Sequence, residues 1–142
     1  MTYGRQRSWD NIEKSNHFYS DWRRGISGPS GGNFGQCMDA DFIEFEALGG
    51  RAKIFGQFEF VNVSYDNWSS NAPKDYPIPF YKRNLFEEYE RRGIPYYVVW
   101  RRDDLGGFFV ERVGNGLVRN PVKEYNFLQY QEWLKNLRKE VK

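Results

Sequence analysis

A strand, a helix and a second strand follow one another between residues 52 and 104, and this succession constrains the fold most. Residues 52–63 and 94–104 are rich in β-branched and aromatic side chains, which favours strands. Residues 80–93 carry apolar side chains at helical spacing and end in Gly93, a residue typical of helix ends. Such a crossover predicts two parallel strands with a right-handed connection. The second strand is apolar through Trp100, which predicts a central position in the sheet.

Shorter elements complete the expected fold. In chain order they are a helix over 10–24, a glycine-rich loop over 25–36, a strand over 41–47, a turn over 48–51, a loop over 64–79, a strand over 108–114 and a helix over 124–142. The expected fold class is therefore mixed α/β, with a short, mixed, twisted sheet of about four strands flanked by helices. We expect a single domain over residues 1–142.

Composition narrows the kinds of site that the chain can build. Cys37 and His17 are the only residues of their types, which rules out an internal disulfide and a metal site built from cysteines or histidines. A bound metal would need oxygen ligands, which points to Mg²⁺, Mn²⁺ or Ca²⁺. The net charge is +2, so binding of nucleic acid would require a local basic face. We find neither a bilayer-spanning apolar run nor a signal peptide, and we expect a cytoplasmic protein without a membrane partner.

Three polar side chains on the expected hairpin form a candidate site. Gln57 and Glu59 are two residues apart on one strand, so they share a face. A hairpin centred near residue 49 would place Asp41 opposite Gln57, and Asp39 could join from the same side. Lys53 shares the face of Gln57 by even spacing but lies farther down the strand. Two carboxylates and an amide oxygen can hold a hard divalent cation. The spacing alone favours solvated side chains on an outer strand.

Four segments that follow one another along the chain carry a family resemblance. They are an aromatic-basic helix end, FYSDWRR (18–24), an aspartate-led strand, MDADFIEF (38–45), a glycine-proline-apolar strand, GIPYYVVW (93–100), and a closing helix, YNFLQYQEWLKNLRK (125–139). In this order they resemble the PD-(D/E)XK nuclease superfamily, and within it the small Holliday-junction-resolvase-like proteins common in phages. The resemblance covers most of the chain and implies a restriction-endonuclease-like fold.

The resemblance also implies a set of site residues. In that family a carboxylate on the first strand and a Glu-x-Lys on the second bind metal and position water. Asp41 matches the first carboxylate, whereas Gln57 stands at the glutamate position and Glu59 at the lysine position. The implied catalytic residues are Asp41, Gln57 and Glu59, and the cofactor is Mg²⁺ or Mn²⁺. Asp41 and Glu59 would bind the metal with help from Asp39 and Glu13, although Glu13 fits a helix-capping role as well.

Basic residues supply the expected contacts to DNA phosphates, although an ordinary solvated surface would explain any one pair of them. They are Arg23, Arg24, Lys53, Arg83, Arg101 and Arg102. The expected function is a metal-dependent DNA endonuclease, or a resolvase that acts on branched DNA. It would work as a homodimer, in the host cytoplasm if a phage encodes it. The alternative is a catalytically degenerate nuclease-fold module that binds DNA or a protein partner, for example a phage-encoded inhibitor. A small structural α/β protein is a third interpretation.

Overall fold

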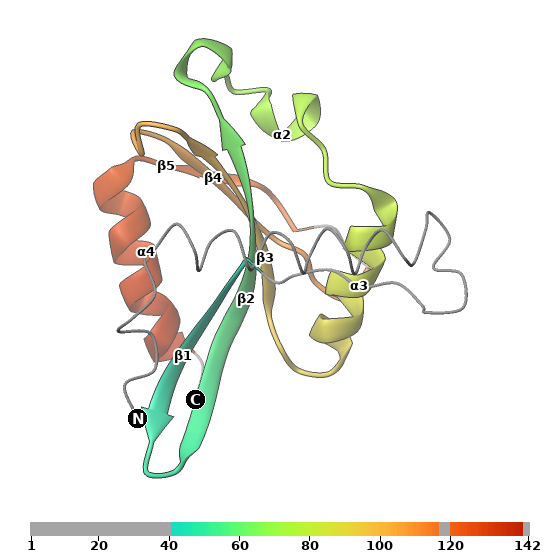
Figure 1. Cartoon of the computed structure of the whole chain (residues 1–142), viewed down its shortest axis with the longest axis vertical. Helices are drawn as coiled ribbons and strands as arrows, with labels where there is room; N and C mark the ends of the chain where they lie inside the picture. Colours follow the sequence, from blue (N-terminus) through green and yellow to red (C-terminus); the bar gives the residue numbers. More distant parts are fainter. Residues whose placement is uncertain (1–40, 117–119, 141–142) are drawn as a thin grey trace, which may run out of the picture. The chain divides into compact units, whose positions relative to one another are not determined.

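The computed structural model describes residues 41–116 and 120–140, which belong to the compact unit Ala40–Lys142. A mixed sheet of five strands, ordered β1-β2-β3-β4-β5, forms its centre. Helices α3 and α4 lie on opposite sides of this sheet (Figure 1). The mixed α/β class is confirmed, and the single domain over 1–142 stays a prediction. The helix expected over 10–24 and the loop expected over 25–36 lie outside the described residues.

The described elements match the expected order, with three short additions. They are β1 (Phe42–Leu48), β2 (Arg51–Val63), the 3-10 turn η2 (Tyr65–Asn67), α2 (Ala72–Asp75), α3 (Phe80–Arg91), β3 (Tyr96–Arg102), β4 (Phe108–Arg112), β5 (Lys123–Tyr125) and α4 (Phe127–Glu140). The short helical turns lie where the sequence predicted only loop. The strand β5 includes Glu124, where the sequence predicted the start of the last helix.

Strand pairing confirms the predicted crossover. β2 and β3 are parallel and joined through α3, whereas β1–β2, β3–β4 and β4–β5 are antiparallel. β3 is the central strand, as its apolar sequence predicted. Gly93, two residues after the last residue of α3, has φ +85°, a left-handed conformation that suits a glycine at a helix end. No helix within the described residues is long and apolar enough to cross a membrane.

The β1–β2 hairpin contains a tight turn and a bulge. Gly49 and Gly50 form the turn with φ +48° and +86°, which is the type of turn that Gly-Gly favours. Farther along, Glu44 pairs with Gly56 and Phe45 with Ile54, so Phe55 is an extra residue on β2. A bulge shifts the register of everything beyond it, including the start of β1. This shift decides which side chains meet at the candidate site.

Helix α4 covers a predominantly apolar side of the sheet. Phe108 stacks on Tyr130 of α4 with ring centroids 4.1 Å apart, and Trp133 contacts the rings of Phe58 and Tyr97. Leu137 is buried in the same cluster. The helix begins at Phe127 because Asn126 and Gln129 cap it reciprocally. Each side-chain oxygen accepts a hydrogen bond from the backbone N–H of the other residue, at 2.8 and 2.9 Å.

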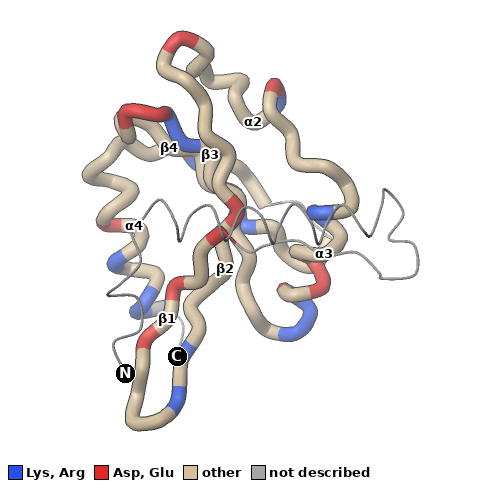
Figure 2. The backbone as a smooth tube through the Cα atoms, viewed as in Figure 1, with Lys and Arg blue, Asp and Glu red and all other residues tan. Residues whose placement is uncertain are grey.

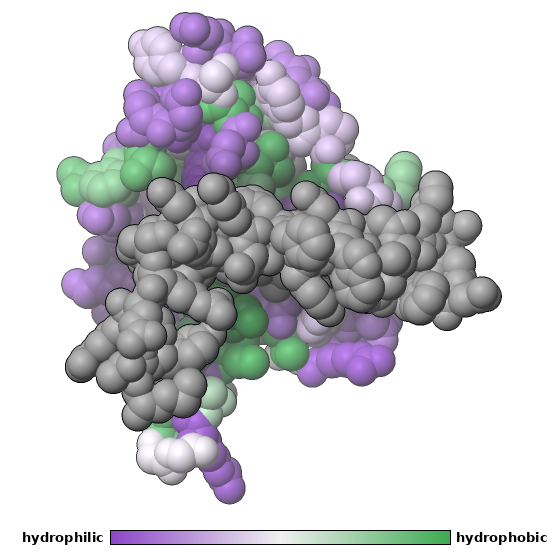
Figure 3. Space-filling model, in the orientation of Figure 1, coloured by the Kyte–Doolittle hydropathy of each residue, from purple (hydrophilic) through white to green (hydrophobic). Residues whose placement is uncertain are grey.

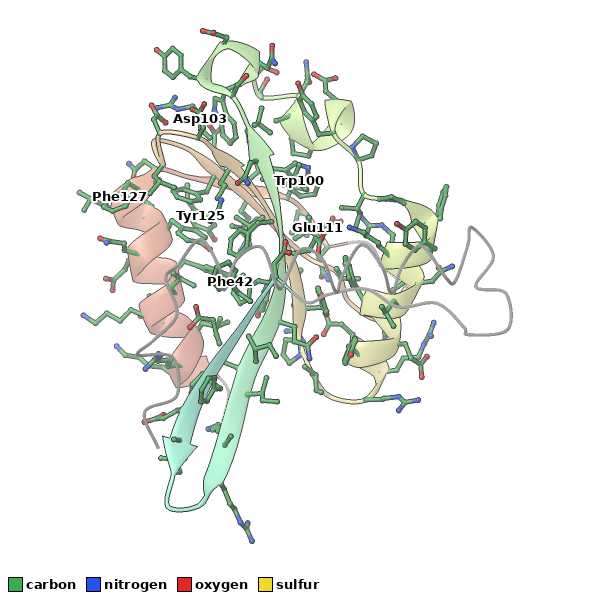
Figure 4. The ribbon with its side chains drawn as sticks, in the orientation of Figure 1. Phe42, Trp100, Asp103, Glu111, Tyr125 and Phe127 are labelled. Atoms are coloured by element: carbon green, nitrogen blue, oxygen red, sulfur yellow. The ribbon has the colours of Figure 1, made fainter. Side chains whose placement is uncertain are left out.

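Helix α3 covers a side of the sheet that mixes aromatic and charged groups. Phe86 of α3 stacks on Tyr96 of β3, with ring centroids 3.9 Å apart. The sheet also buries three polar side chains, Gln57, Glu59 and Glu111. Glu59 pairs with Val98, and Val98 pairs with Glu111, so the two carboxylates lie in one row across β2, β3 and β4. Figure 4 shows Glu111 on the side of the sheet that faces α3 and Phe42 on the side toward α4.

Candidate functional site

The structure brings Asp41 next to Glu59, and not opposite Gln57 as the sequence predicted. Phe42 pairs with Phe58 and Ile43 with Gln57, so Asp41, one residue before Phe42, lies beside Glu59. Two causes account for the difference from the expected register. The turn is centred between Gly49 and Gly50, and the bulge at Phe55 adds one more residue to β2. Figure 2 shows acidic positions close together where β1 begins alongside β2.

A backbone contact to β2 holds the Asp41 carboxylate. Phe60 donates its N–H to Asp41 Oδ2 at 2.8 Å. This bond lies at the end of the β1–β2 ladder, where Phe60 has no partner within the pairs Phe42–Phe58 through Leu48–Arg51. It ties the Asp41 side chain to the residue that follows Glu59. Two carboxylates on neighbouring strands are therefore positioned by the backbone of the hairpin itself.

Glu59 is buried and forms an ion pair with Lys82 of α3. Lys82 Nζ lies 2.9 Å from Glu59 Oε1, and the Glu59 side chain is 9% exposed. Burial raises the pKa of the Glu59 carboxyl above its usual range, the hydrogen bond from Lys82 lowers it, and the negative charge of Asp41 raises it further. The net shift is upward. A buried carboxylate beside a second negative charge is stabilised by added positive charge.

Two buried oxygen atoms of this group have no hydrogen-bond partner within the described part of the chain. They are Glu59 Oε2 and Gln57 Oε1. Both side chains lie on one face of β2, because they are two residues apart, and the bond from Lys82 to Glu59 shows that this face is toward α3. Buried polar atoms are nearly always paired, so two orphaned acceptors beside a second carboxylate indicate a place for a donor or a cation. Asp41, Gln57 and Glu59 are called the oxygen cluster below.

The oxygen cluster offers the kind of oxygen atoms that bind a hard divalent cation, although only two of its three side chains are carboxylates. Among the residues that the structure describes, no group of three or more His, Cys, Asp or Glu side chains could hold a metal ion. Asp41 and Glu59 supply two carboxylates, and Gln57 supplies a neutral oxygen. Mg²⁺ and Mn²⁺ accept such mixed oxygen sets and complete them with water. The orphaned atoms therefore fit the cofactor that the family resemblance implies.

Tyr96 lies beside the oxygen cluster. It pairs with Gln57 across the β2–β3 ladder and is almost fully buried beneath Phe86. Burial raises the pKa of the Tyr96 hydroxyl, and the charges of Glu59 and Asp41 raise it further. The hydroxyl therefore stays protonated and can donate a hydrogen bond close to the two carboxylates.

A second ion pair joins α3 to the same row of the sheet. Arg83 Nη2 lies 2.9 Å from Glu111 Oε1, and Arg83 Nη1 lies 3.4 Å from Glu111 Oε2. Glu111 is fully buried, and only 15% of the Arg83 side chain is exposed. The guanidinium thus bonds both carboxylate oxygens. The phosphate contact expected for Arg83 stays a prediction, but this arginine already has a structural partner.

The other expected DNA-contacting residues within the described range do not surround the oxygen cluster. Lys53 lies over the ring of Phe55, which belongs to the α4-side core, because the bulge reverses the even spacing between Lys53 and Gln57. Arg101 lies over the ring of Phe60 and donates to Asn62. Arg102 pairs with Asp104 at 2.6 Å in the β3–β4 turn.

Four of the site residues expected from the sequence lie outside the described residues, namely Glu13, Arg23, Arg24 and Asp39. The structure in turn adds Lys82 and Tyr96 to the candidate site. One sequence signal could have found Lys82. It is the third residue of the crossover helix, and the start of such a helix packs over the strands that it connects. Tyr96 carries no signal of its own, because an aromatic residue in a buried strand is ordinary core.

Comparisons with protein-family models, with curated proteins and with solved structures found no match to this chain. Any functional assignment therefore depends on the geometry of the oxygen cluster and on the order of the elements that position it.

Proposed function

We propose that the chain is a metal-dependent DNA endonuclease with a restriction-endonuclease-like fold, and that Asp41 and Glu59 are its metal-binding carboxylates. The observation that carries this proposal is the adjacency of these two acids on a bent hairpin, with the orphaned oxygens of Glu59 and Gln57 beside them. The hairpin, the crossover through α3 and the parallel β2–β3 pair are in the order that the resemblance implies.

The observed register changes how the chain matches the family pattern. The residue beside Asp41 is Glu59, so Glu59 takes the glutamate position of Glu-x-Lys, and Gln57 does not. Val61, two residues farther, then takes the lysine position. The departure from the pattern is thus smaller than the sequence suggested, because the acid is present and only the lysine is replaced. Lys82 brings an ammonium group to Glu59 from α3 instead.

In this proposal each residue at the site has its own role. Asp41 and Glu59 would bind Mg²⁺ or Mn²⁺, and Gln57 would add a neutral oxygen ligand. The metal, when bound, lowers the pKa of its water and neutralises charge on a phosphodiester. The Phe60 N–H keeps the Asp41 carboxylate in place. Tyr96 can donate a hydrogen bond to an anionic oxygen, since its hydroxyl stays protonated.

The proposal is tested by cleavage of branched and linear DNA in the presence of Mg²⁺ or Mn²⁺. We expect nicking that requires the metal and that falls by about 100-fold in Asp41→Asn, because this variant keeps the oxygen that accepts from Phe60 but loses the charge. Asp103→Asn, in the β3–β4 turn, is the matched control and should cleave like the parent chain. Folded protein that cleaves neither substrate with either metal would refute the proposal. Sedimentation of the active protein tests the homodimer that accompanies it.

A catalytically degenerate module is the second candidate, and Val61 favours it. An apolar side chain at the lysine position leaves β2 without the cation that the family places there. Such a module would bind DNA or a protein without metal and without cleavage. Binding that is unchanged in Asp41→Asn and in the presence of a chelator would support this candidate over the endonuclease.

A further inference from the structure

Lys82 and Glu59 form an ion pair that leaves half of the carboxylate unused. Lys82 Nζ bonds Oε1 at 2.9 Å, while Oε2 is buried and has no partner within the described residues. The Lys82 side chain is 27% exposed, so the ammonium group lies at the boundary between the cluster and solvent. An ammonium group on four methylene groups can move to water or to another anion at small cost.

The charges around Glu59 explain why the lysine is there and why it can be replaced. Asp41 and Glu59 are neighbouring acids on β1 and β2, and Gln57 adds an unpaired oxygen. One ammonium group offsets part of this negative charge and leaves the orphaned oxygens unsatisfied. A dication attracts both carboxylates about twice as strongly as a monovalent group at the same distance, and it also ligates neutral oxygens.

We propose that Lys82 is a displaceable counter-ion: it occupies Glu59 in the metal-free chain, leaves when a divalent cation binds the oxygen cluster, and then faces the phosphate of the substrate. This inference deepens the proposed function and rests on it for the substrate only. The displacement itself concerns the metal and needs no DNA. It makes Lys82 and the metal competitors for one carboxylate, that of Glu59.

A structural role and a competing role of Lys82 predict opposite changes in metal affinity when the lysine is removed. If Lys82 only supported the structure of the site, its removal would loosen the cluster and weaken metal binding. If Lys82 competes with the metal, its removal should tighten metal binding. We expect Lys82→Met and Lys82→Gln to bind Mn²⁺ about five- to tenfold more tightly than the parent chain, because the cation no longer has to displace an ammonium group. Both should cleave DNA more slowly, because the charge that faces the phosphate is lost.

The experiment is Mn²⁺ titration of the full chain without DNA, followed by cleavage assays on the same preparations. Lys74→Met, an exposed lysine of α2, controls for the change in net charge, and Arg83→Lys controls for a neighbouring ion pair of α3. Neither control should change the affinity for Mn²⁺. A second measurement follows the side-chain ammonium signal of Lys82 by NMR, assigned by its loss in Lys82→Met. Addition of Mg²⁺ should turn it from a bonded, slowly exchanging signal into a mobile one.

The outcomes separate this inference from the proposed function. Unchanged or weaker Mn²⁺ binding in both Lys82 variants, or an ammonium signal that Mg²⁺ does not alter, would overturn the displacement even if the chain cleaves DNA. Tighter binding in the variants with a released Lys82, but without cleavage by the parent chain, would support the displacement and refute the endonuclease.

Discussion

Two neighbouring residues of α3 form ion pairs with the same row of the sheet. The two pairs differ in burial and in how many carboxylate oxygens the cation bonds. Arg83 bonds both oxygens of Glu111, which is fully buried. Lys82 bonds one oxygen of Glu59 and leaves the other without a partner within the described residues. The first pair is closed, and the second is open. A closed pair holds helix and sheet together, whereas an open pair beside a second acid retains the capacity to bind something else.

The choice of cation explains the difference. A guanidinium presents a planar fork that matches both oxygens of a carboxylate, so arginine satisfies a buried acid completely. An ammonium group is a point charge that contacts one oxygen at a time and moves readily. The surroundings differ as well, since Asp41 and Gln57 lie beside Glu59. A buried carboxylate with incomplete pairing is thus a better sign of a functional site than burial alone.

The largest expected effect is on stability, and it separates the two pairs. Arg83→Met leaves Glu111 buried without its arginine and should lower the free energy of unfolding by about 3–5 kcal/mol. Lys82→Met should lower it by only about 1–2 kcal/mol, because the lysine contributes a single hydrogen bond at a partly exposed position. Urea denaturation of both variants measures the difference. Equal losses would mean that the open pair is as structural as the closed one.

The next effect is on cleavage, and it compares the two buried acids. Glu59→Gln should reduce the rate by about 100-fold, or about 2.7 kcal/mol of barrier, because an amide keeps an oxygen for Lys82 but loses the charge that binds metal. Glu111→Gln should leave the rate per folded molecule unchanged. The measurement is metal-dependent nicking, corrected for the folded fraction by circular dichroism. A similar loss in both variants contradicts a site centred on Glu59.

A conservative exchange of cations should convert the open pair into a closed one. Lys82→Arg brings a fork that can bond both Glu59 oxygens, so we expect the affinity for Mn²⁺ to fall by about tenfold. The reverse exchange, Arg83→Lys, opens the pair at Glu111 but creates no metal site, because no further acid of the oxygen cluster lies there. Calorimetric titration with Mn²⁺ checks both. Unaltered affinity in Lys82→Arg would show that Glu59 Oε2 is not a ligand.

The smallest effect is a gain in stability at the orphaned amide. Gln57→Leu removes a buried polar atom without a partner in the described part of the chain and should raise the free energy of unfolding by about 1 kcal/mol. It should also weaken Mn²⁺ binding, because a neutral ligand is lost. Gln129→Leu is the control of opposite sign, since Gln129 caps α4. A Gln57→Leu variant that is less stable than the parent would indicate that the amide has a structural partner.

The exposed apolar residues of β1 show that the oxygen cluster is not the only unusual part of this hairpin. Phe42, Ile43, Phe45 and Leu48 are each about half exposed, and the hairpin end of the molecule carries white and green surface in Figure 3. β1 is also an edge strand. Edge strands with exposed apolar side chains favour association. Nothing within the described residues shows what covers this strand.

Local patterns predicted the elements well and the register poorly. The Gly-Gly turn, the stop at Gly93 and the apolar spacing of the crossover helix each have a local cause, and each was found in place. The bulge at Phe55 lies beside Gly56, a glycine inside a strand and hence a local sign of a bulge, but the sequence pattern does not give the register on either side of it, where Phe55 packs into the α4-side core. This extra residue and the turn centre between Gly49 and Gly50 together moved Asp41 from the side of Gln57 to the side of Glu59. β5 was missed because three residues are too few for a periodic signal.

The sequence by itself determined the mixed α/β class, the crossover, the central place of β3 and the presence of oxygen-bearing polar side chains in the hairpin. These follow from side-chain periodicity, glycine positions and the scarcity of cysteine and histidine, which act over a few residues or over the whole composition. Only the tertiary structure decided which acids meet, which cation each of them receives and which oxygens stay unpaired. Those facts depend on a bulge and on the packing of α3 across the sheet, and both are set by contacts between residues far apart in the chain.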